Sequence, residues 1–240
     1  MLVRLLAIPG SHPCAAVAAM LDAKGVAYTR VDLLPGPSRV WLRATGWGAA
    51  TVPALRLDGV RVQGSRAIAR ALDARWPQPP LYPADPAART RIEEIEAWGD
   101  GPLQEVARRI ILWTLLRSAE GRRASAAHAR LRFPLPPALA PAASWPFLRL
   151  DAALHGAREE AVRADLAALP EMLDRIDAWI GGGELGGEPP TAADYQAAGS
   201  LRLLLTIEDL APVFAGRPAA DLARRLIPEF PGRVPAGVLV

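Results

Sequence analysis

The 240-residue sequence predicts two domains, a small α/β domain at the N-terminus and an all-α domain after it. Three observations indicate this division. The first 78 residues alternate short strand patterns with helix patterns, a proline-rich segment follows, and the rest of the chain shows only the helical repeat of apolar residues. We therefore assign the α/β domain to residues 1–78, a linker to 79–88 and the all-α domain to 89–240.

The α/β domain is expected to follow the order β-α-β-α-β-β-α. Residues 2–8 form an apolar first strand, and the first helix runs from about Pro13, whose fixed φ suits a first turn, to a glycine cap at Gly25. The pattern of residues 27–33 predicts a second strand, and a short helix is expected at 40–44.

The end of this domain has a clearer signal. Two strand patterns at 54–57 and 60–62 flank Asp58-Gly59, a pair typical of a type I′ turn, so the two strands should form an antiparallel hairpin. Ser65 then stands as the N-cap of a third helix, and Pro77 ends that helix.

The helical domain follows the proline-rich residues 78–86. Apolar residues three or four apart from Ile92 to Trp113 predict a long helix, which Gly101-Pro102 should kink or interrupt. Residues 119–156 contain five prolines from Pro134 to Pro146, and we expect a covering loop with short helices there.

Helical periodicity resumes over 157–180, where Pro170 is placed to divide the helix, and the glycines that begin at Gly181 end it. Thr191 and Asp194 then form a signal like a capping box, which predicts the start of another helix.

Composition excludes several classes of protein. The net charge of +3 is spread over arginines among acidic neighbours, which indicates a solvated surface and no nucleic-acid partner. One cysteine excludes an intrachain disulfide, and three distant histidines give no metal-ligand spacing. Without an apolar run of about 20 residues or a signal-like N-terminus, we expect a cytoplasmic protein that does not enter a membrane.

The segment Ser11-His12-Pro13-Cys14-Ala15-Ala16-Val17 joins the first strand to the first helix and points to thiol chemistry. A hydroxyl at the start of a helix can donate a hydrogen bond to a bound thiolate, and the free amides and dipole of the helix add favourable potential. The alternative is that Ser11 only caps the helix. Cys14 is an alternative nucleophile, although free cysteines are among the most often buried residues.

Five local patterns in the right order resemble the cytosolic glutathione S-transferase superfamily. Residues 11–17 resemble the serine-type active-site segment of theta-like members. The other four are Thr51-Val52-Pro53-Ala54-Leu55, Ser65-Arg66-Ala67-Ile68, the linker and helix opening at 81–89, and the capping box at 190–194.

The resemblance implies a thioredoxin-like N-terminal domain, a helical C-terminal domain typical of these transferases, and a homodimer. It also implies an enzyme that uses glutathione, or another low-molecular-weight thiol, as co-substrate without a metal. Ser11 would then stabilise the thiolate of this ligand, and in thioredoxin-like domains the position of Cys14 faces inward.

The thiol would lie along the backbone of Val52, exposed by a cis Pro53, with Gly64 and Ser65 at its γ-glutamyl end. The alternatives are a Pro53 that merely starts a strand and a Ser65 that only caps its helix. Gly64 stands where the family has an acidic residue, so an amino group on the ligand would lack a charged partner, which leaves room for another thiol.

The pocket for the second, electrophilic substrate is less well defined by the sequence. His12 lies next to Ser11 but reads more readily as an exposed loop histidine, and Arg109, Trp113 and Arg117 on the long helix are candidates to line the pocket. Two other functions stay open: a non-catalytic protein with this fold that binds a ligand or a protein, and a glutaredoxin-like reductase that works through Cys14.

Overall fold

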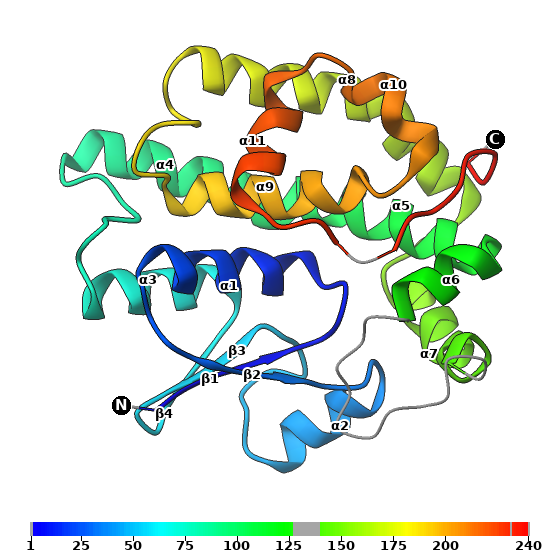
Figure 1. Ribbon diagram of the computed structural model, residues 1–240, viewed down its shortest axis with the longest axis horizontal. Coiled ribbons are helices and arrows are strands. Elements are labelled where there is room, and N and C mark those ends of the chain that lie inside the picture. The colour runs from blue at the N-terminus through cyan, green and yellow to red at the C-terminus, as the bar shows by residue number, and fades with distance from the viewer. Residues whose placement is uncertain (1, 127–139, 231, 240) are drawn as a thin grey trace.

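The computed structural model describes residues 2–126, 140–230 and 232–239. Figure 1 shows a sheet domain below a larger helical domain, with two helices between the sheet and the helical domain. The predicted class, a thioredoxin-like domain followed by a mostly helical region, is confirmed.

The first domain has the predicted order of elements. These are β1 (Val3–Ala7), α1 (His12–Ala23), β2 (Thr29–Asp32), α2 (Pro37–Ala44), β3 (Ala54–Leu57), β4 (Val60–Gln63) and α3 (Ser65–Arg75). The sheet order is β2-β1-β3-β4, in which β1 and β2 are parallel and the other two pairs are antiparallel. Helices α1 and α3 cover one face of the sheet and α2 covers the other (Figure 1).

Strand β1 shows why both faces of the sheet are covered. Side chains alternate between faces along a strand, so Leu5 packs in the main core with α1 and α3, whereas Leu6 packs in a smaller cluster with Leu42 of α2. The β3–β4 turn contains Asp58 at φ 46° and Gly59 at φ 94°, as a type I′ turn requires.

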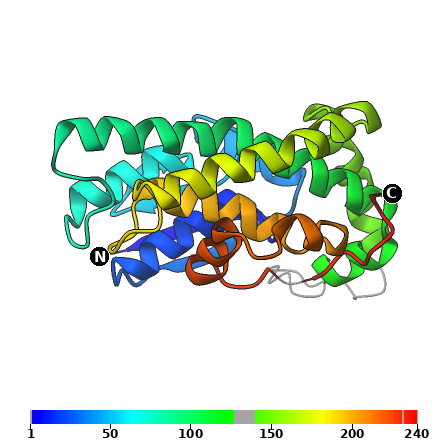
Figure 2. The same cartoon turned by 90° about the horizontal axis from the view of Figure 1, so that it is seen from above.

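The helical domain contains the remaining elements. These are α4 (Pro86–Trp98), the π-helical turn η1 (Gly99–Leu103), α5 (Gln104–Arg117), α6 (Ala119–Ala126), α7 (Ala140–Leu154), α8 (Glu159–Gly181), α9 (Ala192–Leu204), η2 (Glu208–Leu210), α10 (Ala211–Phe214) and α11 (Pro218–Leu226). Figure 2 shows α8 running lengthwise beside the α4–α5 rod.

Helix α9 connects the two domains because it packs against α1 as well as against α4, α5 and α11. The approach to α1 is close: a Cβ added at Gly199 would lie 2.9 Å from the carbonyl oxygen of His12. A glycine at this position therefore lets the start of α1 rest directly on the helical domain. The capping box of Thr191 and Asp194 at the start of α9 is confirmed.

The prolines of the helical domain act differently from one another. Gly101-Pro102 interrupts the α-helical pattern as predicted, but the chain continues through the π-helical turn without a break. The prediction that Pro170 divides a helix is wrong, because α8 is continuous from Glu159 to Gly181. Leu169 and Leu173 are fully buried on either side of Pro170, and this packing holds the helix together despite the missing amide donor.

Two boundaries also differ from the prediction. Helix α4 starts at Pro86 with Asp85 as N-cap, whose carboxylate accepts a hydrogen bond from the amide of Ala88 at 2.8 Å, so the linker ends before residue 88. In the region 119–156, α7 is a 15-residue helix and not a short one. The part of this prediction that concerns residues 127–139 lies outside the described residues.

None of the helices in the described ranges is both long and apolar enough to cross a membrane.

Candidate functional site

Ser11 lies in the tight connection between β1 and α1, at the N-cap position of α1. Its amide donates to the carbonyl of Ile8 at 3.1 Å, and its carbonyl accepts from the amide of Ala15 at 3.0 Å. Its hydroxyl makes no capping hydrogen bond to α1. The backbone of Ser11 therefore fixes its position, while its hydroxyl is not used to cap the helix.

Cys14 follows one turn later and is completely buried. Burial raises the pKa of the Cys14 thiol to about 11, even though hydrogen bonds from the Ser11 side chain and from the Ile8 backbone act in the opposite direction. Only a small fraction of the Cys14 thiol is therefore ionised at neutral pH, which makes Cys14 a poor nucleophile.

The peptide bond between Val52 and Pro53 is cis, as the resemblance implied. This bond immediately precedes β3, and β3 runs antiparallel to β1 with Ala54 opposite Leu6. The start of β3 and the end of β1 therefore lie at the same end of the sheet. This geometry brings the backbone of Val52 to the same side as Ser11.

Helix α3 and its N-cap both begin one residue earlier than the sequence predicted. Gly64, at φ 90°, is the N-cap, and Ser65 is the first helical residue, so the prediction that Ser65 is the N-cap is wrong. The reason is that the buried Ser65 hydroxyl donates to Oδ1 of Asp100 at 3.1 Å instead of to the start of its own helix. A Cβ at Gly64 would meet no atom within 4 Å, so the space beside the helix start is open.

Asp100 is a residue of this site that the sequence analysis missed. It lies in η1, and its Oδ1 also accepts a hydrogen bond from Nε2 of Gln196 at 3.2 Å. A carboxylate therefore stands beside the start of α3 although position 64 carries none. The available signal was Asp100 within Gly99-Asp100-Gly101-Pro102, at the predicted interruption of the long helix.

The sequence predicted that His12 is an exposed loop histidine, and this prediction is wrong. His12 is the first residue of α1, only 4% exposed, because α1 begins against α9. Burial and the nearby charge of Arg108 lower the pKa of His12 to about 3, and its buried Nε2 has no hydrogen-bond partner among the described residues. At neutral pH this imidazole is therefore uncharged.

Arg109 points to α8 and not to the N-terminal domain. Its guanidinium makes two hydrogen bonds of 2.7 Å with the carboxylate of Asp165 and a third of 3.2 Å with Glu105. Trp113 is half-buried against the main core, with the guanidinium carbon of Arg117 5.0 Å from its ring centroid. No described contact brings Arg109 or Trp113 together with Ser11. Arg108, the neighbour that acts on His12, was not singled out by the sequence.

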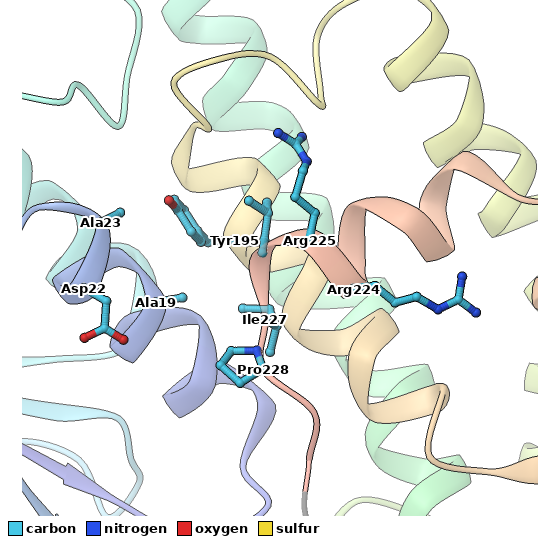
Figure 3. Close-up of a pocket in the computed structure, with 9 residues that line it drawn as sticks. Ala19, Asp22, Ala23, Tyr195, Arg224, Arg225, Ile227 and Pro228 are labelled. Carbon is cyan, nitrogen blue, oxygen red and sulfur yellow. The ribbon is translucent and has the colours of Figure 1, made fainter.

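A separate cavity of about 420 Å³ lies between the C-terminal half of α1 and α11. Figure 3 shows that Arg224 and Arg225 extend away in different directions and that Asp22 is turned away from Tyr195. The cavity thus has no convergent charged groups, and it lies at the opposite end of α1 from Ser11. The described residues include no group of three or more His, Cys, Asp or Glu side chains placed to hold a metal ion.

Known proteins that this chain resembles are glutathione S-transferases. Residues 5–80 match the family described as glutathione S-transferase, N-terminal domain. A glutathione S-transferase from Rhodospirillum rubrum F11 superimposes with a TM-score of 0.61 at 21% identity, covering 99% of this chain and 98% of that one. No curated protein matches the sequence significantly.

Two further solved structures share the fold. A glutathione S-transferase from Methylobacterium radiotolerans, in complex with glutathione sulfonate, gives a TM-score of 0.55 at 20% identity over 94% of this chain and 90% of that one. The β-etherase LigF from Sphingobium sp. strain SYK-6 gives 0.59 at 19% identity over 94% and 99%. At these identities the likeness shows a common fold.

Proposed function

Because residues 5–80 form a glutathione S-transferase N-terminal domain and the whole chain has the cytosolic glutathione S-transferase fold, we propose that the protein is a thiol transferase. In this proposal it binds glutathione on the N-terminal domain, stabilises its thiolate and transfers the sulfur to an electrophile. We also propose a cytoplasmic homodimer, as the resemblance implies, and the theta-like assignment remains a prediction.

The observation that carries the proposal is the position of Ser11. Its hydroxyl stands at the N-terminal end of α1 and is not used to cap that helix. A hydrogen bond to a charged group contributes about 1.5–3 kcal/mol, and a helix terminus adds about 0.3–1 kcal/mol. An alkyl thiol titrates near 8.5, so about 2.7 kcal/mol is needed to lower its pKa by two units. These two contributions suffice without a general base.

The ligand would be positioned by two backbone features. The bond between Val52 and Pro53 is cis, and in this proposal it would leave the backbone of Val52, just before β3, open for an extended peptide to pair with. The start of α3 offers free amides to a carboxylate, with Ser65 as its first residue.

Asp100 supports glutathione as the thiol. Its carboxylate stands beside the start of α3 through the hydrogen bond from Ser65. A helix start next to a carboxylate suits a group that carries both a negative and a positive charge. The γ-glutamyl end of glutathione carries an α-carboxylate and an α-ammonium group. Asp100 would thus take the role of the acidic residue that the family has at the position of Gly64.

In the reaction, the thiolate sulfur forms a bond to an electrophilic carbon, and the bond from that carbon to its leaving group breaks, so that the leaving group departs with the electron pair. Proximity and stabilisation of the thiolate would supply the catalysis. The reductase alternative receives no support, because Cys14 is buried and its pKa is raised.

Calorimetric titration with reduced glutathione, combined with an absorbance titration of the bound thiol, tests the proposal. Ser11→Ala should leave saturable binding in place but raise the pKa of the bound thiol by about one to two units. Ser125→Ala in α6, the same change at a helical position elsewhere, should leave this pKa unchanged. Absence of binding up to about 10 mM, an affinity weaker than roughly 3 kcal/mol, would refute the glutathione assignment. Binding with an unaltered thiol pKa in Ser11→Ala would refute the role of Ser11.

Asp100→Asn provides a second arm of this test. It should weaken glutathione more than an analogue that lacks the α-amino group, because only glutathione loses a charge partner. Equal weakening of both ligands would show that Asp100 does not bind the ammonium group.

A further inference from the structure

The connection between α2 and β3 ends at the cis Val52–Pro53 bond. Two packed residues hold its ends: Trp47 is buried in the smaller cluster with Leu42, and Pro53 is buried directly before β3. The residues between them, 48–52, are exposed or half-buried and have no regular secondary structure. Burial therefore fixes the two ends of this segment, and its middle needs other contacts to be held in place.

Gln63, the last residue of β4, supplies those contacts. Its Oε1 accepts a hydrogen bond from the amide of Ala49 at 2.8 Å, and its Nε2 donates to the carbonyls of Ala49 at 2.7 Å and of Thr51 at 2.6 Å. Among the described residues, every hydrogen bond of residues 48–51 goes to this one side chain. The amide group of Gln63 thus fixes the backbone of this segment relative to β4.

The backbone of Val52 stands between two held points. On one side Gln63 holds Thr51. On the other side the carbonyl of Pro53 accepts a hydrogen bond from the amide of Gly64 at 3.0 Å. The amide and carbonyl of Val52 themselves make no hydrogen bond with another described residue. An unpaired donor and acceptor on a backbone that is already held can pair with an extended peptide at a low cost in ordering.

The pairing of β1 with β3 shows where Val52 lies. Leu6 is opposite Ala54, so the same register, continued by two residues, sets Val52 level with Ile8. The carbonyl of Ile8 accepts a hydrogen bond from the amide of Ser11 at 3.1 Å and not from Val52. The unpaired backbone of Val52 therefore lies next to the connection that carries Ser11.

We propose that Gln63 is a positioning residue of the thiol site, which holds the backbone of Val52 in place to pair with the cysteinyl residue of glutathione. The inference rests on the proposed function and adds a side chain that acts from outside the ligand contacts. With the γ-glutamyl end at the start of α3 and the sulfur at Ser11, the cysteinyl residue is the part of the ligand that passes Val52. Gln63 touches neither the ligand nor the sulfur in this arrangement, so it acts on binding and not on stabilisation of the thiolate.

The probes are glutathione and its ester analogue, in which an oxygen replaces the amide N–H of the cysteinyl residue. The two ligands share their charges and their thiol, but only glutathione can donate a hydrogen bond to the carbonyl of Val52. Calorimetry gives the affinity for each ligand, and an absorbance titration gives the pKa of the bound thiol. One hydrogen bond of ordinary strength should let the wild type bind glutathione about fivefold more tightly than the ester.

Gln63→Met keeps the length of the side chain but none of its hydrogen bonds. It should reduce the preference for glutathione to less than about twofold and leave the pKa of the bound thiol unchanged. Gln63→Glu should do the same, because two of the three bonds need a donor and a carboxylate only accepts. A side chain that only stabilises the fold would weaken both ligands equally and preserve the preference.

Arg61→Met is the matched control on β4. Arg61 also bonds the connection between α2 and β3, but its Nη1 donates to the carbonyl of Gly46 at 2.6 Å, before the buried Trp47 and away from Val52. This variant should keep the preference of about fivefold.

Backbone order parameters of the free wild type, measured by NMR, need no variant. Residues 48–52 should be as rigid as β3, with values of about 0.85, and values below about 0.6 would overturn the proposal. Equal binding of the two ligands by the wild type would also overturn it, as would a folded Gln63→Met protein that keeps the preference. Failure of the proposed function appears differently, as absent glutathione binding, and the order parameters test the rigidity of this segment independently of that result.

Discussion

Mild acid should destabilise this protein through His12. The folded protein keeps this imidazole neutral down to a pH of about 3, whereas the unfolded chain takes up the proton near pH 6.5. Because the pKa of His12 is lower in the folded protein than in the unfolded chain, the protein has its full stability above pH 6.5 and loses stability as the pH falls toward 3. The free energy of unfolding should therefore fall by about 1.4 kcal/mol per pH unit in this window. Between pH 7.5 and 5.0 the loss amounts to about 2 kcal/mol.

Urea denaturation of the wild type and of His12→Gln at pH 7.5, 6.5 and 5.0 measures this loss. The variant cannot take up the proton, so its advantage over the wild type should grow by about 2 kcal/mol across the range, whatever its stability at pH 7.5. His155→Gln is the control, and it should produce a smaller change because the His155 side chain is 28% exposed. A free-energy difference between wild type and His12→Gln that is the same at all three pH values would refute the burial of a neutral His12.

Three other predictions concern stability and thiol reactivity. Burial raises the pKa of Glu96 in the folded protein. The stability that this shift contributes is therefore greatest below the unfolded-state pKa and is lost as the pH rises through the folded-state pKa. Glu96→Gln should remove this loss in urea denaturation from pH 4 to 7, and the same pH dependence in the variant and the wild type would contradict the prediction. Asp165→Asn breaks the two-bond pair with Arg109 and should cost about 1–3 kcal/mol by the same method, so a cost near zero would show that the pair adds nothing. A rise in the pKa of Cys14 from 9.0 to about 11 should slow its reaction with a disulfide reagent by about 100-fold at neutral pH relative to urea-unfolded protein, and equal rates would disprove an inert thiol.

Local signals in the sequence were enough to predict most elements of the fold. Asp58-Gly59 forms its turn because both residues tolerate positive φ, and Thr191 with Asp194 starts α9 because the capping box needs only four consecutive residues. The cis bond before Pro53 followed from the family resemblance, which the sequence also carried.

Long-range packing decided what local signals did not. Pro170 carries a local signal for a helix break, yet the buried stripe on either side of it keeps α8 continuous. Residues 119–156 show little periodicity, so the length of α7 was not predictable from the pattern of that segment.

The candidate site divides in the same way. The sequence by itself placed Ser11 at the start of a helix, because a helix start is a property of consecutive residues. The family resemblance, which the sequence also carried, marked Gly64 as the position where an acidic residue was expected. Only the tertiary structure decided that Asp100 stands beside Ser65, that His12 is buried and that Arg109 turns to α8. The surroundings of a side chain depend on segments far apart in the chain, and packing of the helical domain on α1 and α3 brings those segments together.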